Sequence, residues 1–74
     1  MSLAEEIVRE IATPTGERRV LLIRRADGRF TYRWQERDGL DWGPMSIDAG
    51  VYDSAETAEL EARQRVSWLK RLFH

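Results

Sequence analysis

The sequence predicts an α+β fold, in which a three- to four-stranded antiparallel β-meander is followed by one C-terminal α-helix packed on one face of the sheet. Three observations predict it: turn signals at TPTG (residues 13–16) and at DG (27–28), an alternation of aromatic and polar residues after the second turn, and a helical stripe of small and apolar residues near the C-terminus. The length of 74 residues suits a single small domain, with the sheet over about 6–50 and the helix over about 54–72.

Residues 6–12 are predicted to form the first strand, although their pattern also fits a helix. Pro14 and Gly16 suit a type I turn closed by a left-handed glycine, which makes a three-residue hairpin loop with a bulge. Against this, the apolar residues of the segment 3–11 recur at helical spacing. We favour the strand, because a turn of this kind joins two strands.

The segments before and after Asp27–Gly28 are predicted to form a hairpin with a two-residue turn. Such a turn pairs Ile23 with Tyr32 and fixes the register of both strands. The expected inner face, which the helix would cover, then carries these side chains: Leu21, Ile23, Phe30, Tyr32 and Trp34. A looser loop over 37–44 and a short, irregular strand within 42–51 complete the predicted sheet.

The C-terminal helix is predicted from a start signal and an apolar stripe. Asp53 or Ser54 can accept hydrogen bonds from the first free amides of the helix. Acidic residues lead and basic residues follow, an order that complements the helix dipole. The stripe consists of Ala55, Ala58, Ala62, Val66, Leu69 and Phe73. Its alanines allow the helix to lie close to a sheet that carries large aromatic residues.

The composition argues against catalysis and against membrane contact. The chain has no cysteine, and its one histidine is His74, so the usual nucleophile pairs and a cysteine-based zinc site are missing. Asp38, Asp41 and Asp48 fall around loops, where acidic residues form turns, and they lack the spacing of a calcium loop. We therefore expect neither enzymatic activity nor a cofactor. No apolar run approaches the roughly 20 residues of a membrane span and no signal-peptide pattern occurs, so we expect a cytoplasmic protein.

Arginines concentrate between residues 18 and 37, where seven of them accompany only two acidic residues. Five arginines on the predicted outer face could contact nucleic acid: Arg18, Arg24, Arg29, Arg33 and Arg37. The net charge of −1 disfavours this alternative. Charged residues on the solvated side of a half-covered sheet are also the ordinary expectation.

The preferred hypothesis is a non-catalytic protein-interaction module. In the predicted register, Val8, Val20 and Leu22 lie on the outer face together with Arg24 and Arg33. An apolar centre with arginine at its edge is typical of a partner surface. The partner would be another protein or a second copy of the chain. Trp68, which lies off the main helical stripe, caps the edge of the core or serves as a further contact anchor.

The strings RRADGRFTYRWQE, GVYDSAETAELEAR and SWL together resemble short uncharacterised bacterial proteins that are built from a β-meander and a closing helix. The resemblance extends from Arg18 to Leu69. It implies the same fold and carries over no activity, cofactor or site residue. The outline of sheet plus helix is also similar to the arm-type DNA-binding domains of phage integrases, which implies the nucleic-acid alternative. The chain departs from those domains in its net charge, and we expect no attached catalytic domain.

Overall fold

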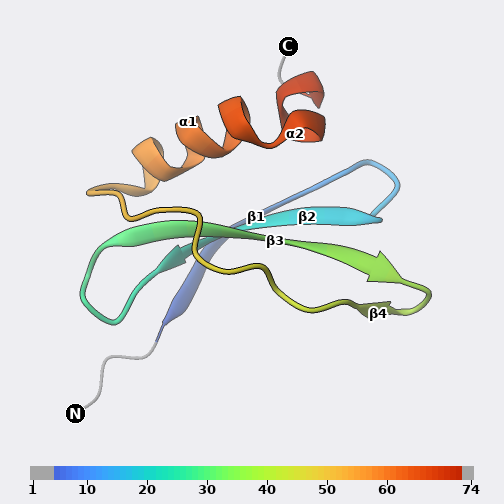
Figure 1. The fold of residues 1–74 in the computed structure, drawn as a ribbon, viewed down its shortest axis with the longest axis horizontal. Coiled ribbons are helices and arrows are strands. Elements are labelled where there is room, and N and C mark those ends of the chain that lie inside the picture. The colour runs from blue at the N-terminus through green and yellow to red at the C-terminus, as the bar shows by residue number, and fades with distance from the viewer. Residues whose placement is uncertain (1–4, 73–74) are drawn as a thin grey trace.

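The computed structural model describes residues 5–72 and shows a four-stranded antiparallel sheet with a helical segment across one face (Figure 1). The strand order in the sheet follows the chain, β1-β2-β3-β4. The elements are β1 (Glu6–Ala12), β2 (Arg18–Arg24), β3 (Phe30–Asp38), β4 (Asp41–Trp42), α1 (Ala55–Arg65) and α2 (Ser67–Leu72). The predicted fold class is confirmed.

Residues 6–12 form strand β1, so the helical alternative for 3–11 is wrong over its described part, while Leu3 and Ala4 lie outside the described residues. The turn that follows β1 explains why residues 6–12 form a strand and not a helix. Gly16 adopts a φ of 76° and donates its amide to the carbonyl of Thr13 over 2.9 Å, as the TPTG signal predicts. The amide of Thr13 then bonds to the carbonyl of Arg18, so the loop comprises the four residues 14–17 and not the predicted three, and the two strands continue from the pair of Thr13 with Arg18.

The hairpin between β2 and β3 has a register that differs by one residue from the prediction. The amide of Arg25 bonds to the carbonyl of Arg29 over 2.7 Å, and Gly28 is left-handed with a φ of 85°. This is a three-residue loop, a type I turn followed by a left-handed glycine, and not the expected two-residue turn. Leu22 therefore pairs with Tyr32, and Val20 pairs with Trp34.

A shift of one residue exchanges the two faces of a strand. Val20 and Leu22, which were predicted on the outer face, lie with Tyr32 beneath the helix. Leu21 and Ile23 take the opposite face, so their predicted place in the inner face is wrong. The core beneath the helix consists of Ile11, Val20, Leu22, Tyr32, Ala58, Ala62 and Leu69, with Phe30, Tyr52, Val66 and Trp68 packed against it.

The helical segment begins and breaks at identifiable residues. The Ser54 hydroxyl accepts the amide hydrogen of Thr57 over 3.1 Å, which makes Ser54 the N-cap. Ala58 and Ala62 are fully buried, and this allows α1 to sit close to β2 and β3, as the alanine stripe predicts. Val66 takes an extended conformation, so the predicted single helix is divided there into α1 and α2. Phe73 and His74 lie outside the described residues.

The segment 43–52 closes the outer edge of β3 without forming a regular strand. The amides of Gly43, Ser46, Ala49 and Tyr52 donate to carbonyl groups of β3 at distances of 2.8 to 3.2 Å. The amide of Trp34 in turn donates to the Ser46 hydroxyl over 3.0 Å. The predicted short strand within 42–51 is therefore wrong beyond Trp42, because the later residues of this segment bond to β3 only at intervals. In Figure 1 this segment passes from β4 along β3 towards the start of α1.

Candidate interaction cleft

The structure does not bring the predicted interaction face together. Val20 and Leu22 are 0% and 2% exposed, so no partner can reach them. Val8 is exposed at a bulge in β1. Arg24 pairs across β2 and β3 with Phe30, on the helix side, and its guanidinium lies 2.9 Å from the Glu6 carboxylate. The predicted apolar stripe on the outer face is therefore wrong, and the one-residue change in register is the reason.

The outer face of the sheet, the face opposite α1, is closed by charged side chains. Leu21 and Ile23 are nearly inaccessible there, at 1% and 2% exposure. Arg33 on β3 donates to Asp48 over 2.6 Å and to Glu5 over 2.6 Å. Because β2 lies between β3 and β1, the Arg33 side chain must cross β2 to reach Glu5, which precedes β1. Hydrogen bonds to Glu5 and Asp48 raise the pKa of the Arg33 guanidinium above its ordinary value.

Arg19 forms a second crossing on the same face. Its Nε and one terminal nitrogen donate to the Gln35 side chain over 2.8 and 2.6 Å, and the other terminal nitrogen donates to Glu10 over 2.8 Å. The guanidinium also lies 4.1 Å above the ring of Trp42. The side-chain amide of Gln35 in turn donates to the carbonyl of Gly43 over 2.9 Å, which links Arg19 to the residue that follows β4. Leu21 stands between Glu10 on β1 and Arg33 on β3 in the sheet register. Alkyl stems of arginine can cover apolar surface in this position while their charged ends stay solvated.

The five arginines of the nucleic-acid alternative do not form one surface. Arg33 faces the outer side and is engaged by two carboxylates. Arg37 pairs with Trp42 at the β3–β4 hairpin, and Arg29 follows the Gly28 turn. Arg18 and Arg24 lie on the helix side, each beside a glutamate. The sheet therefore divides these side chains between two faces and a turn.

A different surface gathers exposed apolar side chains, and we call it the Trp34–Trp68 cleft. It has a volume of about 580 Å³ and lies between β3, the segment 47–49 and the junction of α1 with α2. Its residues are Arg18, Tyr32, Trp34, Glu36, Ile47, Asp48, Ala49, Arg65, Val66, Ser67 and Trp68. Trp34 is 41% exposed and Ile47 is 85% exposed.

The cleft exists because the helix covers only part of the inner face. The alanines of α1 pack over the middle of β2 and β3, while Trp34 lies further along β3. The extended conformation of Val66 ends α1 beside this uncovered part of the sheet. Trp68 then follows in α2, where it packs against the edge of the core and also lines the cleft. Both roles considered for Trp68 in the sequence are thus compatible.

The rim of the cleft carries charges of both signs. Arg18 lies 3.8 Å from Glu36, and Arg65 lies 3.1 Å from Glu61. The side chains of Arg18, Glu36 and Arg65 are half exposed or more, so solvent screens these ion pairs. At the floor, the phenol of Tyr32 has a raised pKa, chiefly because burial disfavours its charged form.

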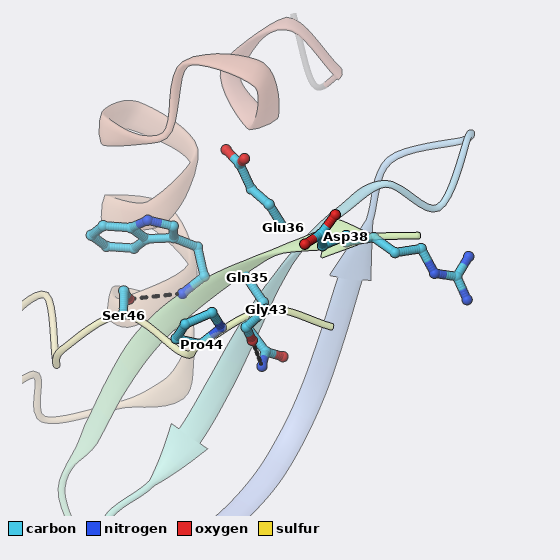
Figure 2. Close-up of a pocket in the computed structure, with 8 residues that line it drawn as sticks. Gln35, Glu36, Asp38, Gly43, Pro44 and Ser46 are labelled. Carbon is cyan, nitrogen blue, oxygen red and sulfur yellow. Dashed lines mark hydrogen bonds between the residues drawn. The ribbon is translucent and has the colours of Figure 1, made fainter. Parts of the chain in front are cut away.

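A second hollow adjoins the cleft along β3 and is drawn in Figure 2. Its volume is about 500 Å³, and it shares Trp34 and Glu36 with the cleft. Figure 2 shows Glu36 directed towards the helix side of β3 and Gln35 directed away from it, where it bonds to Gly43. Pro44 and Ser46, in the segment that runs along β3, form the wall opposite to β3. Concave surface thus extends on both sides of Trp34.

The sequence pattern assigns Trp34 to the correct face of the sheet but does not indicate that its ring is exposed, and it does not single out Ile47. The alternation of Phe30, Tyr32 and Trp34 correctly assigns all three side chains to the helix side, but periodicity does not show where the helix stops covering the strand. Ile47 stands in an irregular segment whose apolar residues have no clear period. Its position between polar neighbours in MSIDAG was the available signal.

Within residues 5–72, no group of three or more His, Cys, Asp or Glu side chains could hold a metal ion. Neither α1 nor α2, the helices of the described part of the chain, is long and apolar enough to cross a membrane. Comparison with known proteins gives no further guide, because no protein-family model, curated protein or solved structure matches this chain.

Proposed function

We propose that the chain is a small non-catalytic protein-interaction module that binds its partner through the Trp34–Trp68 cleft. The observation that carries the proposal is the convergence of two indole rings and a protruding isoleucine on one hollow of the surface. Trp is prominent among the residues that dominate binding energy, and exposed apolar surface of this kind marks interaction sites.

The shape of the surface favours a protein over a small ligand. Pockets for small molecules enclose most of their ligand. Here two adjoining hollows share Trp34, and Ile47 projects from the wall of the cleft, so the surface is uneven and extended. A macromolecular surface with its own projections and recesses fits such a relief.

The outer sheet face, by contrast, is a poor docking surface. Leu21 and Ile23 are nearly inaccessible there, and Arg33 and Arg19 on the same face are engaged in hydrogen-bonded ion pairs, so this face offers a partner little apolar surface. Leaving buried charges without partners is costly. We therefore propose that the partner binds on the helix side of the sheet and not on the outer face.

The test compares Ile47→Asp with Leu40→Asp as a matched control. Leu40, in the β3–β4 turn, is 92% exposed and does not line the cleft. Immobilised wild-type protein and both variants are incubated with native extract, and retained proteins are identified by mass spectrometry. We expect a partner that is retained by wild type and by Leu40→Asp and lost with Ile47→Asp. Identical sets of retained proteins for all three would contradict the proposal.

A further inference from the structure

We infer that the occupant of the Trp34–Trp68 cleft is a second copy of this chain, in an isologous dimer in which each protomer places Ile47 in the cleft of the other. This inference rests on the proposed function and names its partner. In an isologous contact the same patch is used by both subunits, so the patch must be complementary to itself.

The relief of the patch favours a second copy of the chain as its occupant. Ile47 lines the cleft and is also 85% exposed, so a projection and a recess stand side by side. A two-fold axis between two such patches brings the projection of each copy opposite the recess of the other. The recess is walled by the indoles of Trp34 and Trp68 together with Val66, a set that suits a branched aliphatic side chain.

The charge pattern of the rim also favours a second copy. Each rim arginine has a carboxylate beside it, with Arg18 next to Glu36 and Arg65 next to Glu61. A patch of a single sign would repel its own copy, whereas a patch with alternating signs can exchange its ion pairs across the axis. Because both arginines are already accompanied by glutamates, the rim selects neither a strongly acidic nor a strongly basic foreign partner.

Another route to self-association, pairing along the free edge of β1, is disfavoured. A bulge interrupts this strand between Ile7 and Arg9, and the charged residues Glu6, Arg9 and Glu10 form ion pairs within the protein. Bulges and charges are devices that prevent edge-to-edge pairing of sheets. The net charge of −1 adds little repulsion between copies, so the charge of the chain does not oppose a homodimer through the cleft.

The experiment measures mass by analytical ultracentrifugation and light scattering on the full chain, from micromolar to millimolar concentration. We expect the mass of wild type to rise with concentration from 8.7 kDa to twice that value. Ile47→Asp should weaken dimerisation by about tenfold or more, because it brings a carboxylate against two indoles. Leu40→Asp should dimerise like wild type. Circular dichroism and thermal melting check that Ile47→Asp remains folded, as expected for a change at a largely exposed residue.

Two results would overturn the dimer. One is a wild type that stays monomeric at millimolar concentration. The other is a dimer that Ile47→Asp leaves unchanged, since self-association would then use a different surface. The proposed function has a separate readout: a foreign protein that is retained by wild type and lost with Ile47→Asp would uphold the cleft as a binding site even if the chain were monomeric.

Discussion

At the scale of single residues, Tyr32 shows how position in the sheet sets chemistry. Its ring is buried beneath α1 and stacks on Tyr52, with ring centres 6.2 Å apart. Burial is the main reason that the pKa of Tyr32 is raised, and Tyr52 and Glu61 act in the same direction, whereas Arg65 opposes them. The folded protein therefore holds the Tyr32 proton more tightly than the unfolded chain does.

A pH dependence follows from this shift. The stabilising contribution is complete below the ordinary tyrosine pKa of 10.0 and is lost as the pH rises through the higher pKa of the folded state. We expect the free energy of unfolding to fall between about pH 9 and pH 11, and to fall less steeply for Tyr32→Phe. Urea titrations at several pH values measure this, with Tyr52→Phe as the control that keeps most of the dependence. Parallel profiles for wild type and Tyr32→Phe would refute the assignment.

Leu22 and Trp34 test which side chains belong to the core. Leu22→Ala removes a fully buried side chain beneath α1 and is expected to lower the free energy of unfolding by about 2–5 kcal/mol. Trp34→Ala should cost less than Leu22→Ala, because much of its ring already contacts solvent in the cleft. Chemical denaturation of the two variants gives the ranking. The opposite order would place Leu22 on an open face, as the two-residue turn requires.

At the scale of elements, turn chemistry decided how far the sequence could be interpreted. The strands, the helix start and the aromatic face follow from local patterns, and the structure confirms them. The register of β2 against β3 does not follow from local patterns, because Asp27–Gly28 is compatible with a two-residue loop and also with the last two positions of a three-residue loop. Both faces of β2 are apolar over Val20–Ile23, so hydrophobic pattern could not choose between the two registers.

Gly28 provides a direct test of that loop. Its φ of 85° is unfavourable for residues with a side chain, and an added Cβ would meet nothing within 4 Å. Gly28→Ala is therefore expected to destabilise the protein through the backbone alone, by roughly 1–2 kcal/mol. Gly28→Asn should cost less, since asparagine tolerates the left-handed region. Thermal melting of the two variants distinguishes this backbone effect from a steric effect. A steric effect would make the larger asparagine more destabilising than alanine.

No local sequence pattern predicts the Arg33 network, because its partners Glu5 and Asp48 are distant from Arg33 in the chain. Arg33→Met keeps an apolar stem and removes the hydrogen bonds, and we expect a loss of roughly 1–3 kcal/mol. The control is Arg24→Met, which breaks a well-exposed pair with Glu6 and should cost about 1 kcal/mol or less. Equal losses in urea titrations would show that the network over β2 contributes no more than an ordinary surface pair.

At the scale of the whole molecule, the sheet is covered on both faces by different means. The helix side has a hydrophobic core, and the outer side carries the ion pairs of Arg33 and Arg19 on the face where Leu21 and Ile23 are buried. Composition and periodicity indicate the first kind of cover. They cannot indicate the second, because each ion pair depends on which strands are neighbours. The candidate cleft was equally hidden, since it depends on where α1 ends over β3.

The same arrangement leads to a prediction about nucleic acid. Binding to a polyanion requires many cations on one surface and weakens steeply with salt. Here Arg33 is engaged by Glu5 and Asp48 on the outer face, Arg18 and Arg24 lie on the helix side beside glutamates, and the net charge is −1. We expect no shift of a mixed-sequence DNA or RNA probe in a gel assay at low salt. A complex that forms at low salt, dissolves as salt is added and is weakened by Arg29→Gln or Arg37→Gln would show that the arginines act together despite their division between faces. That outcome would favour the nucleic-acid alternative over the interaction cleft.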